Sequence, residues 1–137
     1  MVYHGTKNDF SSFAAQLGAD AGYHFGTLAQ ANMRAAGGGK KIVSAYLRIE
    51  NPKRMKDTGQ KWSKAQLAAA KRQGYDGIVY LNRYEGTKTE NVVRAHEAGV
   101  DLDRMSDKEF KKWFPEAEDS YVAFDNEQIL IVDFGKE

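Results

Sequence analysis

The sequence contains no cysteine and no long apolar run among its 137 residues. Without cysteine the chain cannot build a disulfide framework or use a thiolate nucleophile, and this fits a reducing compartment. No apolar segment approaches the length of a membrane span, and the first residues lack the basic and apolar regions of a signal peptide. We therefore expect a cytoplasmic protein with no membrane partner.

An excess of charge of either sign is also missing, because twenty Lys and Arg residues stand against nineteen Asp and Glu residues. The net charge of +1 provides no overall field that would attract nucleic acid or an acidic membrane. The local basic runs Lys40–Lys41 and Lys108–Lys112 are interpreted as solvated faces. Binding of nucleic acid or an acidic protein by these runs stays an alternative.

Two kinds of ligand site are absent from the pattern. The chain has neither G-x-G-x-x-G nor G-x-x-x-x-G-K, so a Rossmann or P-loop phosphate site is not supported. Its three histidines do not follow the spacing of an H-E-x-x-H metal site, and we expect no metal. His96 lies in a charged stretch and is assigned to the surface.

The composition that is present, 42% hydrophobic and 12% aromatic, is typical of a globular protein, and the length suits one domain over residues 1–137. Short apolar runs predict about six strands, over 2–4, 23–25, 42–49, 77–82, 121–124 and 129–134. Asn51–Pro52 is expected to stop the third strand, and the last two strands to form a hairpin around Asp125–Glu127.

Capping boxes, a Ser or Thr followed three residues later by Gln or Glu, mark the helix starts. They occur at Thr27–Gln30, Ser63–Gln66 and Ser106–Glu109, with Trp62 and Leu67 as a hydrophobic staple at the second. The three helices are expected to end at Gly37–Gly39, Gly74 and Pro115, and residues 11–17 to add one or two helical turns. Residues 83–104 are polar without a clear period and are interpreted as a mobile loop. Strands and helices do not alternate strictly, so the fold class is α+β.

Two short segments, Val2–Thr6 and Gly22–Thr27, carry the functional prediction. Each is a brief apolar and aromatic strand with a histidine, followed by Gly and Thr. Glycine allows a backbone to approach a ligand closely, and aromatic and imidazole faces beside it suit a flat, polar ligand. We expect the two histidine-bearing strands to face each other across one cleft.

Four stretches in this order resemble the ADP-ribosyltransferase superfamily, which includes poly(ADP-ribose) polymerases and diphtheria-like toxins. They are Tyr3-His4-Gly5-Thr6, Gly22-Tyr23-His24-Phe25-Gly26, the helix that follows, and Asp119 to Asp125 with Gln128-Ile129. The chain is most similar to small transferase domains of phage and mobile-element polyproteins. In those domains Gly-Tyr-Asp-Gly-Ile-Val-Tyr is also followed by Asn and Glu, as in residues 74–85 here.

The resemblance implies a split, strongly bent β-sheet of about six short strands with three to four flanking helices. It also implies an NAD-dependent mono-ADP-ribosyltransferase that binds NAD in the cleft and cleaves the bond between nicotinamide and ribose. ADP-ribose is then transferred to a macromolecular acceptor, for which we expect a protein, with nucleic acid as the alternative. The oligomeric state is left open.

The resemblance also implies roles for individual residues. His4 hydrogen-bonds a ribose hydroxyl, Gly5 presents its backbone to the nicotinamide carboxamide, and Thr6 braces that turn. On the second strand, Tyr23 or His24 stacks on the nicotinamide ring. Phe25 of that strand, with Asn32 and Arg34 of the following helix, completes the expected NAD-binding set.

The family's catalytic glutamate falls on Ser120, which can bond a ribose hydroxyl but accepts its proton poorly. We expect Glu85 to replace the glutamate, because an acid after the neighbouring strand can point into the same cleft. Glu118, Asp119 and Glu127 stay as alternatives. A missing general base costs about 10²–10⁴ in rate.

Three other functions are compatible with the same sequence. A catalytically decayed NAD- or ADP-ribose-binding module would explain Ser120. A small phage-type inhibitor of a host factor would need no cleft at all. A relative of the NAD-dependent RNA 2′-phosphotransferases would use His4 and His24, with Arg34, Arg48 and Arg54 as phosphate ligands.

Overall fold

The computed structural model describes residues 1–6, 22–35, 41–59 and 62–133. These residues form an α+β fold, which confirms the predicted class. The strands are β1 (Val2–Thr6), β2 (Tyr23–Phe25), β3 (Lys41–Leu47), β4 (Pro52–Arg54), β5 (Gly77–Leu81), β6 (Asp119–Ala123) and β7 (Ile129–Asp133). The α-helices are α1 (Leu28–Ala35), α2 (Lys64–Arg72), α3 (Thr89–Glu97) and α4 (Asp107–Trp113). The turns expected over 11–17 and the glycines at 37–39 lie outside the described residues.

The strands lie in two sheets, with the orders β1-β3-β7 and β2-β6-β5-β4. Neighbouring strands are antiparallel, apart from the parallel pair β4 and β5. The sheets meet where β1 passes the end of β2, because Tyr3 and Gly26 exchange two backbone hydrogen bonds of 2.8 Å. This bridge gives the predicted split-sheet arrangement and holds the two histidine-bearing strands side by side.

Alternate side chains of β3 fill the space between the sheets. Val43 and Ala45 are buried there against Phe25 of β2, and Leu47 packs against the same cluster. This is the face that the period of two in the sequence predicts. Burying a side chain of this size contributes about 1.5–3 kcal/mol, so this cluster fixes β2 against the three-stranded sheet.

The capping boxes of α1 and α2 are confirmed. Ser63 Oγ accepts the backbone N–H of Gln66, and Gln66 Oε1 accepts the backbone N–H of Ser63, at 3.1 and 2.9 Å. The staple residues Trp62 and Leu67 then pack with Ile78 of β5 in one cluster on the four-stranded sheet. The local pattern therefore predicts both where α2 begins and which face it buries.

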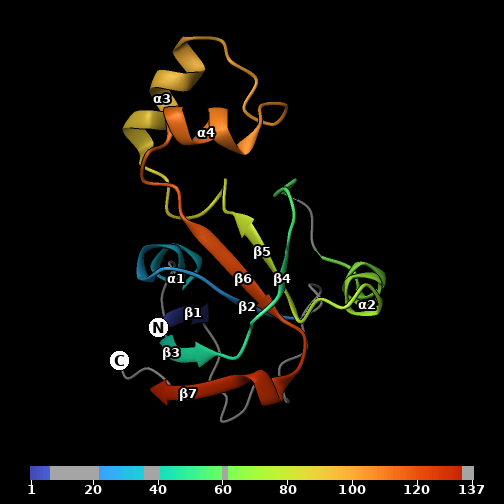
Figure 1. Ribbon diagram of the computed structural model, residues 1–137. Helices are drawn as coiled ribbons and strands as arrows, with labels where there is room; N and C mark the ends of the chain where they lie inside the picture. The colour runs from blue at the N-terminus through green and yellow to red at the C-terminus, as the bar shows by residue number, and fades with distance from the viewer. Residues whose placement is uncertain (7–21, 36–40, 60–61, 134–137) are drawn as a thin grey trace.

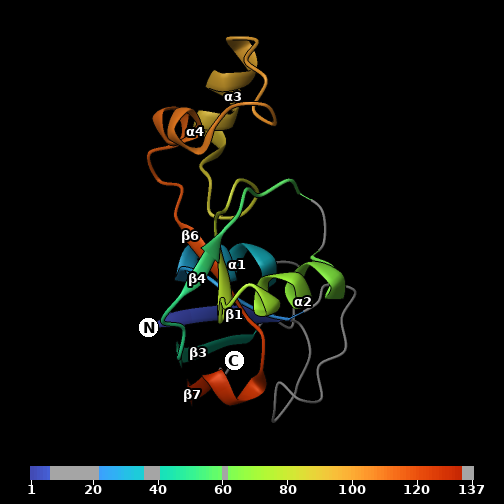
Figure 2. The same ribbon diagram turned by 45° about the vertical axis from the view of Figure 1, so that its right-hand side comes forward.

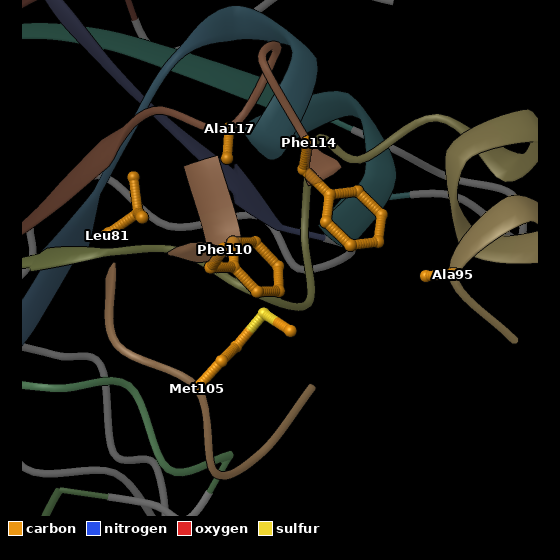
Figure 3. Packing of buried hydrophobic residues seen from close by; sticks show 6 residues of the cluster. All are labelled: Leu81, Ala95, Met105, Phe110, Phe114 and Ala117. Atoms are coloured by element: carbon orange, nitrogen blue, oxygen red, sulfur yellow. The ribbon is translucent and has the colours of Figure 1, made fainter. Parts of the chain in front are cut away.

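Residues 89–117, here called the helical extension, contain α3 and α4. They leave the four-stranded sheet after β5 and return to it at β6, and Figures 1 and 2 show both helices together beyond those strand ends. A separate apolar cluster holds them, in which the Phe110 and Phe114 rings stack at 4.5 Å between centroids (Figure 3). The interpretation of residues 83–104 as a loop is therefore wrong over α3.

One strand was not predicted, and one expectation about the strands is wrong. β3 ends at Leu47, before Asn51–Pro52, and Pro52 then begins the edge strand β4, which brings the strands in the described residues to seven. Proline is tolerated at the first residue of a strand, where its missing N–H costs no ladder bond. β6 and β7 belong to different sheets, so they form no hairpin, and a 3-10 helix (Asn126–Gln128) connects them.

Candidate functional site

A small cavity lies where the two sheets meet, beside the bridge between Tyr3 and Gly26. It has a volume of about 10 Å³, which is room for one water molecule. Five of the predicted site residues line it, and they come from β1, β2, the loop after β5, and β6. These five are His4, His24, Phe25, Glu85 and Ser120. Tyr3, Gly26, Gln30, Ala31 and Tyr80 complete the lining.

The two histidine-bearing strands are joined directly at the cavity. His4 Nδ1 lies 2.7 Å from the backbone carbonyl oxygen of His24, and both side chains are buried. A carbonyl oxygen can only accept, so this hydrogen bond requires that His4 Nδ1 carries a hydrogen. The His4 ring is also tilted against the Phe25 ring, with 5.7 Å between centroids. Two residues of β2 therefore hold the His4 ring in place, and the His24 carbonyl requires the hydrogen on Nδ1.

Strand alternation separates the two candidates for stacking on a ligand. His24 lines the cavity, whereas Tyr23 packs into the cluster between the sheets with Val43 and Ala45. Tyr80, opposite Ser120 in the register of β5 and β6, presents a further aromatic ring to the cavity. The Trp62 ring packs against the Tyr80 ring in a tilted arrangement, with 5.4 Å between centroids. The sequence reasoning did not identify Tyr80.

Ser120 is buried and its hydroxyl has defined partners. The Gln30 amide is oriented by two backbone groups, since its Oε1 accepts the Thr27 N–H at 3.0 Å and its Nε2 donates to the Glu118 carbonyl at 2.9 Å. Ser120 Oγ must therefore donate its hydrogen to Gln30 Oε1, at 2.6 Å. Ser120 Oγ in turn accepts from Asn82 Nδ2 at 3.0 Å. The Ser120 hydroxyl therefore uses its hydrogen on Gln30 and receives one from Asn82.

Glu85 reaches the same cavity from the loop after β5. Its Oε1 accepts a hydrogen bond from Asn82 Nδ2 at 3.1 Å. Its Oε2 accepts none from the residues that the structure describes. Gly86, with φ +82°, lets the loop turn back so closely that an added Cβ would lie 2.9 Å from Gln30 Cγ. Glu85 is thus a half-buried carboxylate with one oxygen bound and one available.

The other acids considered for catalysis have different surroundings. Asp119 forms a bidentate pair with Arg54, at 3.0 and 2.7 Å, and this hydrogen bonding raises the pKa of the Arg54 guanidinium. Glu118 is exposed, and Glu127 is exposed on the 3-10 helix after β6. None of these three carboxylates lines the small cavity.

The remaining predicted residues lie on β1 and α1. Gly5 and Thr6 belong to β1, paired with Ile42 and Lys41 of β3. Asn32 is exposed on α1, and Arg34 lies on the same helix. Of the other arginines of the phosphotransferase alternative, Arg48 and Arg54 do not line the small cavity.

A second, wider groove of about 540 Å³ runs between β3 and β6. It shares Gly26 with the small cavity and is bordered by Glu118, Asp119 and Tyr121, the neighbours of Ser120 along the chain. Alternation along β6 places Ser120 and Tyr121 on opposite faces of the strand. The two hollows therefore lie on either side of β6.

Within the described ranges, no three His, Asp or Glu side chains are grouped to hold a metal ion. None of the helices in those ranges has the length and apolar character needed to cross a bilayer.

Comparison with known proteins identifies a family for the chain. The model of the family described as ADP-ribosyltransferase in polyvalent proteins matches residues 1–133, which is nearly the whole sequence. No curated protein and no solved structure matches the chain significantly.

Proposed function

The chain belongs to the family of ADP-ribosyltransferases in polyvalent proteins, and on that basis we propose that it is an NAD-dependent mono-ADP-ribosyltransferase with a protein acceptor. Family membership supports ADP-ribosyltransferase activity in general. The donor, the acceptor class and the residue roles that follow are our proposal, as is action in the cytoplasm. The absence of cysteine is compatible with that reducing compartment.

One observation carries the proposal. His4, His24, Glu85 and Ser120 are up to 116 positions apart in the sequence, and they line one cavity. Its rings and its single half-buried carboxylate suit a flat, positively charged ring bound next to a reacting sugar. An aromatic face beneath such a cation contributes about 0.5–2 kcal/mol. Because the cavity has room for only one water molecule, we expect NAD to widen it on binding.

In the proposed reaction, the bond between ribose C1′ and the nicotinamide nitrogen breaks. Its electron pair stays with the nitrogen, so neutral nicotinamide leaves and C1′ gains oxocarbenium character. The acceptor nucleophile forms the new bond to C1′ and loses its proton to Glu85. His4 bonds a ribose hydroxyl, and His24 flanks the nicotinamide ring. Ser120 is a poor base, because a neutral hydroxyl is weakly basic and its oxygen already accepts a hydrogen bond from Asn82.

Nicotinamide release from labelled NAD, measured with a lysate as the source of acceptor, tests this function. We expect Glu85→Gln to lower the rate by about 10²–10⁴, the usual cost of a lost general base. Glu127→Gln is the matched control, because it removes an exposed carboxylate outside the cavity. Labelled protein should accumulate in parallel. Absence of nicotinamide release from the unaltered protein, or an unchanged rate in Glu85→Gln, would contradict the proposal.

A decayed binding module is the second candidate, and the engaged hydroxyl of Ser120 favours it. Such a protein keeps the NAD-binding rings but lacks turnover. Calorimetry separates the two functions, since NAD binding without nicotinamide release supports the module. Turnover that disappears in Glu85→Gln excludes it.

A further inference from the structure

Asn82 stands out among the groups that the sequence reasoning left unused, because it is buried at the end of β5 and touches both candidate catalytic residues. Resting on the proposed function, we propose that Asn82 is the positioning residue that holds Glu85 at the reacting centre. Ser120 is its buried anchor.

All the side-chain hydrogen-bonding capacity of Asn82 is used. Oδ1 accepts the backbone N–H groups of Tyr84 and Glu85, at 3.0 and 2.8 Å. Nδ2 donates to Glu85 Oε1 and to Ser120 Oγ, at 3.1 and 3.0 Å. The two backbone N–H groups are obligatory donors, so only Oδ1 can face them. The amide orientation is thereby fixed, and with it the direction of both Nδ2 hydrogens.

This arrangement binds Glu85 at two points. The Asx turn from Oδ1 fixes the backbone of the loop, and the bond from Nδ2 fixes one carboxylate oxygen. The other oxygen, Oε2, is left to act. The strand end cannot shift away, because the Asn82 backbone N–H also donates to the Glu118 carbonyl at 3.0 Å.

We call the hydrogen-bonded group of Asn82, Glu85 and Ser120 the clamp, and Ser120 completes it from the neighbouring strand β6. Its oxygen receives the second Nδ2 hydrogen of Asn82 and its own hydrogen goes to Gln30, so a directional chain runs from β5 through β6 to α1. A serine here accepts this bond, whereas a carboxylate would place a second negative charge beside Glu85. The serine on β6 and the acid after β5 are thus parts of one arrangement.

Two variants separate the halves of the Asn82 amide. Asn82→Asp keeps an oxygen for the backbone turn but replaces the Nδ2 donor by an oxygen that faces the Glu85 carboxylate. Asn82→Ala removes both functions. We expect each to lower kcat for NAD cleavage by about 10²-fold, the cost of a misplaced catalytic group, with less than about a threefold change in KM for NAD. A role confined to the turn would leave Asn82→Asp close to full activity, which would overturn the proposal.

Combination with Glu85→Gln provides the second readout. If Asn82 acts through Glu85, adding Asn82→Ala to Glu85→Gln causes no further fall in kcat. If the two residues act independently, the fold-losses in kcat multiply. Asn51→Ala is the matched control, because its amide bonds the Gly74 carbonyl on the surface, outside the cavity. Its kcat should equal that of the unaltered protein. Multiplying losses in the Asn82 and Glu85 double variant would contradict the assignment.

A third readout does not depend on turnover. In NMR spectra, the Asn82 side-chain amide signals should shift on Glu85→Gln and on Ser120→Ala, and stay in place on Glu127→Gln. A protein without NAD cleavage but with these shifts would refute the proposed function and leave the clamp intact. Unshifted Asn82 signals would refute the clamp itself.

Discussion

Gly26 is the residue at which the two sheets, the small cavity and the wider groove meet. Its backbone exchanges two hydrogen bonds with Tyr3, and it contributes to the lining of both hollows. A Cβ at this position would lie 1.8 Å from Gln30 Oε1 and 2.9 Å from Ser120 Oγ. A side chain at this position would therefore have to displace the Gln30 amide.

We expect Gly26→Ala to displace the Gln30 side chain and to break the bond between Gln30 and Ser120. The free energy of unfolding should fall by about 1–3 kcal/mol, the usual cost of overpacking. Chemical denaturation measures the change. Gln30→Ala removes the amide that Gly26→Ala displaces. The free energy of unfolding of the double variant should therefore fall by less than the sum of the two single losses. Full additivity would show that the two residues do not interact.

Local sequence patterns reveal some roles of the site residues and not others. Gln30 was identified only as the N3 residue of a capping box, which its bonds with Thr27 confirm. Its bonds to Ser120 and to the Glu118 carbonyl join positions about 90 residues apart. No local pattern contains such a contact. The role of Asn82 was invisible for the same reason.

At the scale of elements, the helices that were predicted carry their own caps. The start of α4 is an example, since Ser106 Oγ accepts the Glu109 backbone N–H at 3.2 Å. By contrast, α3 begins at Thr89, its N-cap residue Lys88 forms no side-chain cap, and the helix exposes Val92 and Val93. Its apolar residues therefore show no buried period. Sequence periodicity cannot detect a helix whose support comes from elsewhere in the chain.

That support comes from two distant groups. Arg83 inserts its guanidinium into the helical extension, where it donates to the Leu102 and Met105 carbonyls at 2.6 and 2.8 Å and pairs with Asp107 at 2.8 Å. Glu116 accepts hydrogen bonds from the Lys88 backbone N–H and from Asn91 Nδ2 on α3, at 2.7 and 2.8 Å. The helical extension is thus held by polar contacts between segments that are far apart in the sequence.

The contribution of Glu116 should depend on pH. Partial burial raises its pKa, but the hydrogen bonds from Lys88 and Asn91 outweigh this and lower it below the model-compound value of 4.5. A carboxylate whose folded-state pKa is lowered stabilises the fold fully above the unfolded value, and loses that effect as pH falls through the folded value. The stabilisation should therefore be present at pH 7 and disappear in acid.

We expect Glu116→Gln to lower the free energy of unfolding at pH 7 by at most about 1 kcal/mol, because solvent screens this pair. At pH 3 the unaltered protein and the variant should differ less. Denaturant titrations at the two pH values provide the comparison. Glu97→Gln, an exposed position at the end of α3, serves as the control and should show no such pH-dependent difference. An equal difference at both pH values would exclude the charge as the cause.

For the whole molecule, the main consequence of the fold is that the site forms where two sheets meet, beside the bridge between Tyr3 and Gly26. The resemblance of the sequence to ADP-ribosyltransferases predicts a split sheet, and the two sheets of the described residues agree with it. The strand order and the crossing of β6 to β7 between sheets were not predictable from local patterns. In that crossing, Gln128 of the 3-10 helix donates to the Arg48 carbonyl after β3 at 3.1 Å and to the Asp76 carbonyl before β5 at 2.7 Å, contacts that no local pattern contains.

The narrow cavity leads to a prediction about how the whole molecule takes up NAD. A space of about 10 Å³ is too small for a nicotinamide ring, so we expect the walls contributed by the two sheets to separate as the ring enters. Binding then includes a conformational step, and the observed rate should level off as the NAD concentration rises. Trp62 can report this step, because its ring lies 5.4 Å from that of Tyr80 in the cavity wall.

Stopped-flow tryptophan fluorescence measures the rate. The two tryptophans of the chain provide a matched pair, since Trp113 lies in the helical extension beneath the Arg94 guanidinium, outside the cavity lining. Trp62→Phe should abolish the fluorescence change on NAD addition, and Trp113→Phe should retain both the change and the levelling rate. A rate that rises linearly with NAD concentration to the mixing limit would mean that the ring enters without separating the walls. That outcome would contradict the expected separation of the walls around His4, His24 and Glu85.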